Sequence, residues 1–208
     1  MTEPLVRAIR VARRYGDVEA LAPTDLELAP GETVALIGPN GAGKSTLLAI
    51  LAGALEPSEG SVEVHARRGW VPQRPAQYAR LSPLENLELF ARLERVREPE
   101  RAGRQLLERF ALPTARRPAG ELSVGNRQRL NVAIALLGEP RVLLLDEPTA
   151  SLDPIQRRLV WDVVDALRTE GGAVCFATQN VEEVEHADRV LALQDGRIVG
   201  STVEEVFG

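Results

Sequence analysis

The chain has 208 residues, 44% of them hydrophobic and 26% charged, which is ordinary for a globular protein and long enough for a substantial core. Its formal net charge of −5 argues against a nucleic-acid partner, because nucleic-acid-binding domains usually carry a basic surface. A single cysteine, Cys175, excludes an internal disulfide and fits a reducing compartment. Its apolar neighbours predict a small buried hydrophobe.

The sequence predicts neither a secretion signal nor a membrane span. Its first residues, "MTEPLVRAIRVARRYG", contain no uninterrupted apolar core. Apolar runs such as "VAIALLG" are far shorter than the roughly 20 residues needed to cross a bilayer. If the protein works at a membrane, other subunits must hold it there.

Short apolar runs alternate with helical patterns along the chain, which is typical of α/β proteins. The run 33–38 is a strand that stops at Gly-Pro, and a helix follows from Lys44. Charged amphipathic patterns predict helices over 82–96 and 99–112, and Ser123 is placed as the N-cap of a third helix. The runs 141–148 and 172–179 are apolar on both faces, as in a parallel sheet, and 189–200 predicts a hairpin turned at 195–196.

Because residues 38–46, "GPNGAGKST", fit the phosphate-binding pattern G-x-x-x-x-G-K-[ST] between a strand and a helix, we expect an α/β fold with a P-loop NTPase core. It should contain a mixed, mainly parallel sheet, an N-terminal antiparallel β region and an inserted α-helical subdomain. The whole chain, 1–208, forms one domain in this interpretation, with a catalytic core over 1–74 and 139–208 and the helical subdomain over about 75–138.

The stretch "GPNGAGKST", residues 38–46, contains the only lysine among 25 basic residues. It fits the phosphate-binding pattern G-x-x-x-x-G-K-[ST] with Gly38, Gly43, Lys44 and Ser45, and it lies between a predicted strand and a predicted helix. Glycines let backbone N–H groups wrap a phosphate, and the following helix N-terminus adds positive potential. A flexible ammonium reaches phosphate oxygens as a compact charge, which a planar guanidinium replaces poorly. The Ser45 hydroxyl is a candidate Mg²⁺ ligand.

Two acidic residues follow the predicted strand in "LLLDEPTASLD". The carboxyl ends of parallel strands share one edge of a sheet, which predicts Asp146 and Glu147 beside the phosphate loop. Asp146 is a candidate Mg²⁺ ligand through water, and Glu147 is a candidate base that orients or deprotonates the attacking water.

In this combination the chain resembles the ATP-binding cassette (ABC) ATPases, the nucleotide-binding subunits of ABC transporters, over nearly its whole length. "GPNGAGKST" matches the Walker A motif, "VLLLDEP" the Walker B motif, and "SLD", ending in Asp153, the D-loop. "VPQRP" matches the Q-loop at Gln73, and "ELSVGNRQRL" resembles the signature segment. Tyr15 resembles the aromatic residue on which adenine stacks.

The resemblance implies a dimer that sandwiches two ATP molecules and Mg²⁺ between the Walker A loop of one protomer and the signature loop of the other. The resemblance implies that the catalytic residues are Glu147, Lys44, Gln73 and Gln179. It also implies that the metal ligands are Ser45, Gln73 and Asp146. The implied nucleotide-binding residues are Tyr15, Gly38, Pro39, Asn40, Gly41, Ala42, Gly43, Lys44, Ser45, Thr46, Ser123, Gly125 and Asn126. The partners would be a second cassette, identical or different, and integral membrane permease subunits, at the cytoplasmic face of the cell membrane.

The sequence departs from the family pattern at two places. Val124 and Asn126 replace the third and fifth residues of the usual Leu-Ser-Gly-Gly-Gln signature, which we interpret as tuning. Gln179 occupies the place of the usual switch histidine, while His65 and His186 fall elsewhere. Because glutamine cannot carry a proton at neutral pH, slower hydrolysis is expected.

Three functions remain open at this point. The first is the energy-coupling subunit of a transporter, where "YARLSPLENL" resembles the ABC-2 exporter type and import is not excluded. The second is a soluble ABC mechanoenzyme of DNA repair or translation, which the short insert and the acidic charge disfavour. The third is an ATP-dependent switch with little or no hydrolysis, for which Gln179 is the argument.

Overall fold

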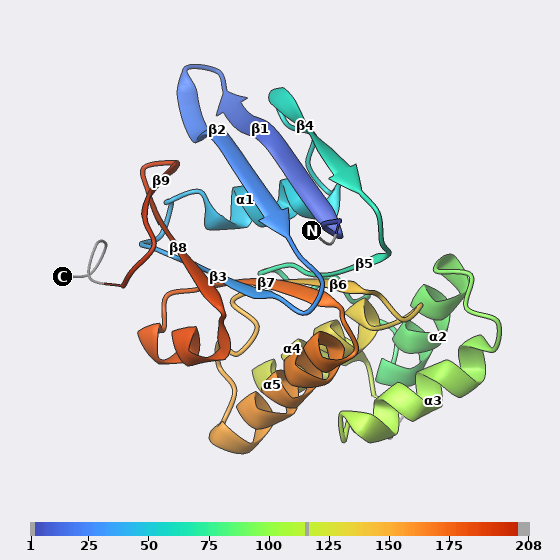
Figure 1. The fold of residues 1–208 in the computed structure, drawn as a ribbon. Helices are drawn as coiled ribbons and strands as arrows, with labels where there is room; N and C mark the ends of the chain where they lie inside the picture. Colours follow the sequence, from blue (N-terminus) through green and yellow to red (C-terminus); the bar gives the residue numbers. More distant parts are fainter. Residues whose placement is uncertain (1–2, 115–116, 204–208) are drawn as a thin grey trace.

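The computed structural model describes residues 3–114 and 117–203, which form two sheets with helices between and beside them (Figure 1). The smaller sheet is antiparallel, in the order β2-β1-β4. Its strands are β1 (Val6–Tyr15), β2 (Val18–Leu28) and β4 (Glu59–Val64). This is the N-terminal antiparallel region expected from the sequence.

The larger sheet has six strands in the order β5-β6-β7-β3-β8-β9. All neighbours are parallel except β8 and β9, which form the expected antiparallel hairpin. The strands are β3 (Thr33–Ile37), β5 (Arg68–Val71), β6 (Val142–Asp146), β7 (Ala173–Thr178), β8 (Arg189–Gln194) and β9 (Arg197–Gly200). The mixed, mainly parallel sheet is confirmed.

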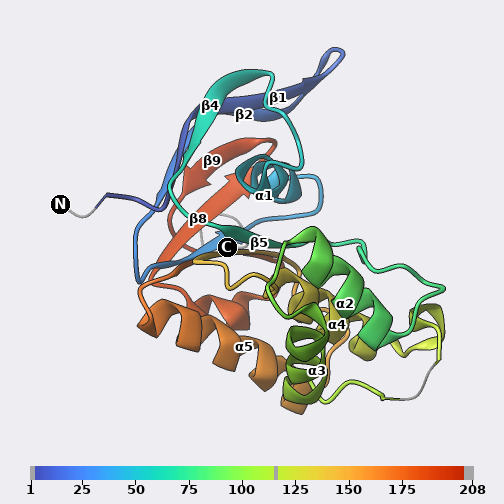
Figure 2. The same ribbon diagram turned by 90° about the vertical axis from the view of Figure 1, so that its right-hand side faces the viewer.

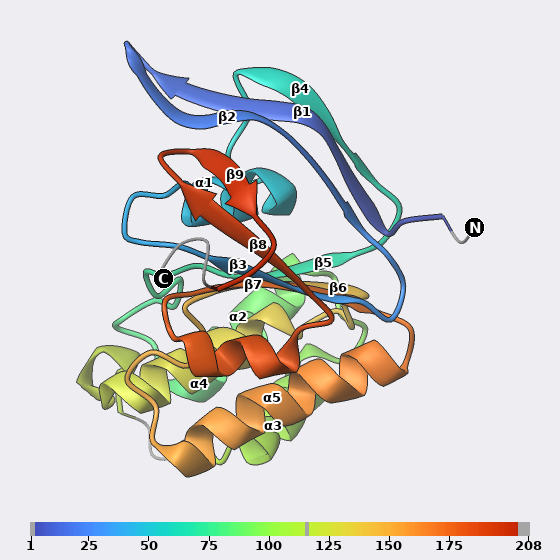
Figure 3. The same cartoon turned by 60° about the vertical axis from the view of Figure 1, so that its left-hand side comes forward.

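Every residue of β3, β6 and β7 is buried, because helices or the second sheet cover both faces of the larger sheet. Helix α1 (Lys44–Ala52) lies between the two sheets (Figure 2). Helices α4 (Val124–Ala135) and α5 (Pro154–Thr169) cover the opposite face (Figure 3). Cys175 of β7 is fully buried, and this burial raises the pKa of its thiol, so its prediction as a small core residue is confirmed.

The predicted insert contains α2 (Pro83–Leu93) and α3 (Pro99–Arg109), which pack against each other (Figure 1). Both begin at a proline, as expected for a first helical position that needs no backbone donor. Ser82 caps α2 by accepting a hydrogen bond from Glu85, whose side chain reaches back in return. Two short 3₁₀ helices, η1 (Ala119–Glu121) and η2 (Val181–His186), complete the described elements. None of the helices within the described ranges has the length and apolar character of a membrane span.

Candidate nucleotide-binding site

The loop between β3 and α1 is shaped by its glycines. Gly38 has φ of +146°, and a Cβ there would lie 2.2 Å from the carbonyl oxygen of Leu193. Gly43, with φ of +101°, would place a Cβ 2.9 Å from the carbonyl oxygen of Ala20. The fold itself therefore demands glycine at both fixed positions of the phosphate-binding pattern.

Lys44 is the first residue of α1 and is only 6% exposed. Its Nζ donates hydrogen bonds to the carbonyl oxygens of Gly38 at 2.7 Å and of Pro39 at 3.0 Å. Burial lowers the pKa of this ammonium, while the nearby carboxylates of Glu147 and Asp146 act in the opposite direction. The lysine thus lies inside the curve of the loop, where an anion would meet it.

The remaining loop residues divide between surface and interior. Pro39, Asn40 and Gly41 are exposed, whereas Ala42 is buried. Ser45 is exposed and Thr46 is partly buried, both in the first turn of α1. The tip of the loop is therefore exposed, while its two ends are buried.

Asp146 ends β6 and is 2% exposed. Burial raises the pKa of its carboxyl, opposed by a hydrogen bond with the Ser45 side chain and by the charge of Lys44. Its Oδ1 is buried without a hydrogen-bond partner. An unpaired carboxylate oxygen beside a hydroxyl fits a hard divalent cation, which in phosphate sites is held by one or two carboxylates together with phosphates and water.

Glu147 follows directly and adopts φ of +49°, an uncommon conformation for a residue with a side chain. Its backbone N–H donates to the carbonyl oxygen of Ala177 at 3.0 Å, which fixes it to the end of β7. Burial raises the pKa of the Glu147 carboxyl, while a hydrogen bond from Gln179 and the charge of Lys44 lower it. A carboxyl with a raised pKa in such a place is suited to accept a proton.

Gln179 lies immediately after β7 and joins two parts of the site. Its Nε2 donates to Asn40 Oδ1 at 2.9 Å and to Glu147 Oε1 at 3.2 Å. The residue that replaces the family's histidine therefore lies between the phosphate loop and the candidate base.

The signature-like segment starts α4. Ser123 caps this helix by accepting a hydrogen bond from the backbone N–H of Asn126 at 3.3 Å, as the sequence predicts. The Asn126 side chain accepts a hydrogen bond from Arg129. A Cβ on Gly125 would lie 2.5 Å from Oε1 of Gln156, so close packing within the chain is one reason for glycine there.

Two further predicted residues, Gln73 and Tyr15, form no hydrogen bond with this cluster in the part of the chain that the structure describes. Gln73 follows β5 at the same edge of the sheet as Asp146, and its side chain is exposed. Tyr15 ends β1, is 51% exposed, and has the Arg13 guanidinium 4.6 Å from its ring centroid. No hydrogen bond among the described residues joins the loop 123–126 to the loop 38–46.

Sequence reasoning missed Gln128, whose Nε2 donates to the carbonyl oxygen of Pro148 at 3.1 Å. This bond ties the signature helix to the segment that follows the two acids. The only signal in the sequence was a polar residue at a helix position that turns out to be buried.

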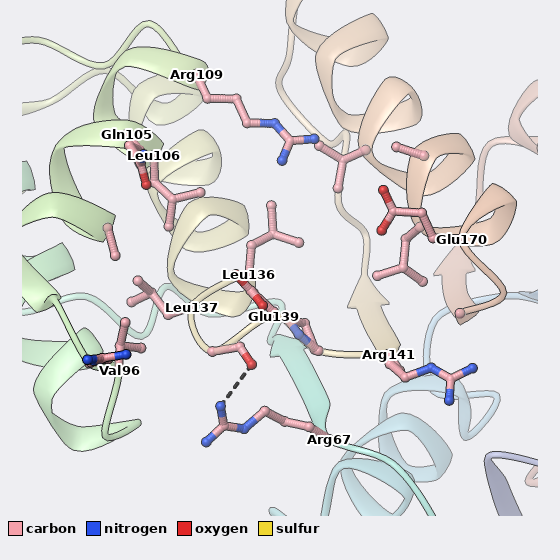
Figure 4. Close-up of a pocket in the computed structure, with 18 of the residues that line it drawn as sticks. Arg67, Val96, Gln105, Leu106, Arg109, Leu136, Leu137, Glu139, Arg141 and Glu170 are labelled. Carbon is pink, nitrogen blue, oxygen red and sulfur yellow. Dashed lines mark hydrogen bonds between the residues drawn. The ribbon is translucent and has the colours of Figure 1, made fainter.

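A cavity of about 1030 Å³ lies elsewhere, at the amino end of β6 between α3, α4 and α5 (Figure 4). Arginines are prominent in its lining, and Arg67 donates to the carbonyl oxygen of Gly138 at 2.8 Å. None of the predicted site residues lines it. The candidate nucleotide site, at the carboxyl edge of the sheet, is therefore separate from this cavity.

The strand–loop–helix, the two carboxyls at the end of the neighbouring parallel strand and the capped helix α4 define a P-loop nucleotide-binding fold of the cassette type. The family model described as ABC transporter matches residues 21–150. This chain belongs to the ABC transporter family, as an ATP-binding cassette.

Several relatives and solved structures support this assignment. The probable multidrug ABC transporter ATP-binding protein YbhF of Escherichia coli is 40% identical over 198 residues, which cover 88% of this chain and 34% of YbhF. The daunorubicin resistance ATP-binding protein DrrA3 of Streptomyces coeruleorubidus is 38% identical, covering 99% of this chain and 71% of DrrA3. This chain therefore spans only about a third of YbhF.

Among solved structures, the dimeric bacterial ABC transporter cassette MJ0796 superposes with a TM-score of 0.87 at 26% identity, over 95% of this chain and 97% of that one. A second structure of MJ0796, a dimeric post-hydrolysis state with ADP and Pi, gives the same TM-score and coverage. These structures and the described fold confirm the α/β cassette architecture with its helical insert.

Proposed function

We propose that this chain binds and hydrolyses ATP and couples hydrolysis to transport through separate membrane subunits. One observation carries the proposal: Gln179 donates hydrogen bonds both to Asn40 of the phosphate loop, at 2.9 Å, and to Glu147, at 3.2 Å. The phosphate loop and the candidate base therefore lie next to each other, an arrangement suited to triphosphate hydrolysis.

In the proposed mechanism the loop 38–46 holds the triphosphate. Its backbone N–H groups and the N-terminus of α1 face the phosphate oxygens, and Lys44 exchanges its two loop carbonyls for β- and γ-phosphate oxygens. Tyr15 offers adenine the ring face that Arg13 leaves open. These contacts orient the nucleotide before any bond breaks.

Magnesium fits the residues beside the loop. Ser45, Asp146 through water, and Gln73 would hold the ion, and the unpartnered Oδ1 of Asp146 supports this. Bound Mg²⁺ supplies positive charge that neutralises the phosphate oxygens during transfer.

Glu147 is the proposed base. Its carboxylate accepts a hydrogen bond from the attacking water and takes its proton as the water oxygen bonds to the γ-phosphorus. The bond from the γ-phosphorus to the bridging oxygen breaks, and ADP leaves with the electron pair of that bond. Gln179, which contacts both Glu147 and Asn40, donates a hydrogen bond to the γ-phosphate. As a neutral donor it stabilises the developing charge less than an imidazolium would.

The signature loop of Ser123, Gly125 and Asn126 is proposed to contact the ATP bound by a second cassette, identical or different. Ser123 lies at the surface, and no hydrogen bond within the described residues joins it to the phosphate loop of its own chain. The dimeric form of the MJ0796 cassette supports such an arrangement. ATP held between two surfaces favours the closed dimer, and hydrolysis removes that contribution.

The proposed partners are integral membrane subunits that dock on the segment after Gln73, with this chain at the cytoplasmic face of the membrane. A division into a core, 1–74 and 139–208, and a helical subdomain over about 75–138 would let the docked subunits sense nucleotide. The words "multidrug" in the name of YbhF and "daunorubicin resistance" in the name of DrrA3 favour export, and the stretch 78–87 resembles the ABC-2 type. A ribose import ATP-binding protein of Rubrobacter xylanophilus, 39% identical, keeps import open.

A second candidate function is an ATP-dependent switch with little hydrolysis. The hydrogen bond from Gln179 to Glu147 favours it, because this bond occupies an oxygen of the proposed base. Both candidates share ATP binding and differ in turnover.

Steady-state ATPase activity of the whole chain, with and without Mg²⁺, tests the proposal, and size-exclusion chromatography with ATP tests the dimer. Magnesium-dependent turnover that Glu147→Gln abolishes supports the enzyme. ATP-driven association without turnover supports the switch. Failure to bind ATP at all refutes both.

A further inference from the structure

Glu183 is a buried carboxylate outside the predicted site. It belongs to η2 and is 6% exposed. Its Oε2 accepts a hydrogen bond from the Thr178 hydroxyl at 2.7 Å, and its Oε1 accepts one from the Thr149 hydroxyl. Since a carboxylate is costly to bury unless it is hydrogen-bonded, these two contacts account for its position.

The two threonines belong to the two segments that carry the proposed catalytic groups. Thr149 lies two residues after Glu147, and Thr178 lies immediately before Gln179. Both threonines are buried, at 3% and 1% exposure. One carboxylate group therefore joins the segment of the base to the segment of its glutamine neighbour.

Glu183 is itself held in place from several sides. Asn180 donates its backbone N–H to Thr178 Oγ1 at 3.0 Å and accepts from the backbone N–H of Glu182 at 3.1 Å. At the end of η2, His186 stacks on Trp161 of α5, with ring centroids 4.1 Å apart. The carboxylate thus acts as a fixed point between the segments, anchored to α5.

We propose that Glu183 is a positioning residue for ATP hydrolysis, which sets the spacing between Glu147 and Gln179 through the hydroxyls of Thr149 and Thr178. The proposal rests on the hydrolytic function proposed above. It adds a residue that touches neither ATP nor the attacking water and acts only through the two side chains that do.

The test variants are chosen for their ability to form hydrogen bonds with the hydroxyls of Thr149 and Thr178. Glu183→Gln keeps an acceptor for one hydroxyl and offers an N–H to the other, because a threonine oxygen also accepts hydrogen bonds. Glu183→Ala leaves two buried hydroxyls without their partner and lets the segments separate. Val164→Ala, at a buried position of α5, is the control for general loss of stability.

Hydrogen–deuterium exchange of the whole chain without nucleotide measures the positioning directly. In Glu183→Ala we expect faster exchange in peptides covering 147–152 and 177–182, including the Glu147 N–H that bonds to Ala177. Glu183→Gln should exchange as the unaltered chain does, and Val164→Ala should not change these two peptides selectively. Unchanged exchange in Glu183→Ala overturns the proposal, whether or not the chain hydrolyses ATP.

Steady-state kinetics then test the consequence for catalysis. Glu183→Ala should lower kcat by at least about ten-fold with a change in KM for ATP below about two-fold, because misplaced groups cost rate while the phosphate loop is untouched. In a Gln179→Ala background the same substitution should lower kcat much less, since the two residues act together. Equal losses in both backgrounds, or a loss shared by Glu183→Gln, contradict the proposal.

The two proposals fail in different ways. An unaltered chain without ATPase activity removes the hydrolytic function, and the exchange experiment still decides whether Glu183 positions the two segments. Active protein with normal kcat in Glu183→Ala removes only the role of Glu183.

Discussion

Gln179 donates a hydrogen bond from Nε2 to Oε1 of Glu147, over 3.2 Å, so the proposed base and its glutamine neighbour are in direct contact. The same amide also donates to Asn40 at 2.9 Å. Entry of a γ-phosphate must exchange one or both bonds. Three residue positions around this contact, Gln179, Glu147 and Lys44, and one pair of glycines allow direct tests.

Gln179→Ala should move the acid limb of the pH–rate profile to higher pH. Burial raises the pKa of Glu147 above its ordinary 4.5, and the hydrogen bond from Gln179 opposes that rise by stabilising the ionised form. Removing the donor lets the pKa rise further, so the base ionises later as pH increases. The measurement is kcat/KM for MgATP across the acid and neutral range, with Gln105→Ala, exposed on α3, as control. If the acid limb stays in place or moves to lower pH, the assignment of Glu147 as the base that Gln179 stabilises is contradicted.

Gln179→His should raise turnover. A protonated imidazole forms a charge-assisted hydrogen bond worth about 1–2 kcal/mol more than a neutral one, which corresponds to roughly ten-fold in rate. Steady-state kcat of the two proteins gives the comparison. An unchanged kcat would mean that the neutral side chain does not limit hydrolysis.

Glu147→Gln should abolish turnover, with a loss of at least about 100-fold, while ATP binding persists. It should also raise the melting temperature of the nucleotide-free chain at neutral pH. The raised pKa means that the folded chain binds the Glu147 proton more tightly than the unfolded chain. Stability therefore falls as pH rises from the ordinary value through the folded pKa, and the glutamine avoids that loss.

Thermal unfolding at several pH values checks this second effect. The difference in melting temperature between Glu147→Gln and the unaltered chain should be largest at neutral pH and shrink at acid pH. Retained ATPase activity in the variant would exclude Glu147 as the base, whatever the melting curves show.

Lys44→Arg should weaken ATP binding by at least about ten-fold, because a planar guanidinium is a poor replacement for a compact ammonium inside the phosphate loop. At 6% exposure the site has little room for the larger group. Isothermal titration calorimetry with MgATP measures the Kd. Arg197→Lys, the reverse substitution at an exposed position of β9 outside the candidate site, is the control. Equal affinity in Lys44→Arg would show that charge alone suffices.

Two glycines should respond differently to the same methyl group. Gly38→Ala meets a backbone oxygen at 2.2 Å with a positive φ, so the free energy of unfolding should fall by about 2 kcal/mol or more. Gly125→Ala meets only the flexible end of Gln156, so its loss should be smaller. Urea denaturation measures both. We expect Gly125→Ala to weaken ATP-dependent association instead. A larger loss of unfolding free energy in Gly125→Ala than in Gly38→Ala would contradict the packing argument.

Local patterns predicted the parts of the fold that depend on nearby residues. The strand before Gly38, the helix from Lys44, the N-cap at Ser123 and the turn at 195–196 each follow from backbone chemistry over a few positions, and the structure contains all four. The mainly parallel sheet followed from strands that are apolar on both faces.

Edge positions of the parallel sheet placed Asp146 and Glu147 beside the phosphate loop, but the sequence did not predict which individual side chains would form hydrogen bonds there. Gln179 and Glu147 are 32 positions apart, and only the pairing of β6 with β7 brings them together. Glu183 lies in "EEVEH", a charged run that is typical of a solvated surface, yet it is buried between two threonines. Burial of a polar side chain depends on the tertiary structure, and no periodicity in that run reveals it.

Because Lys44 is the only lysine, reagents that acylate primary amines find one side-chain target in the whole chain. Burial lowers the pKa of that amine, which increases its uncharged, nucleophilic fraction. Coupling to a resin or a dye through amines would therefore modify either the α-amino group or the phosphate loop. Protection of Lys44 from such a reagent by added nucleotide would give a direct footprint of site occupancy.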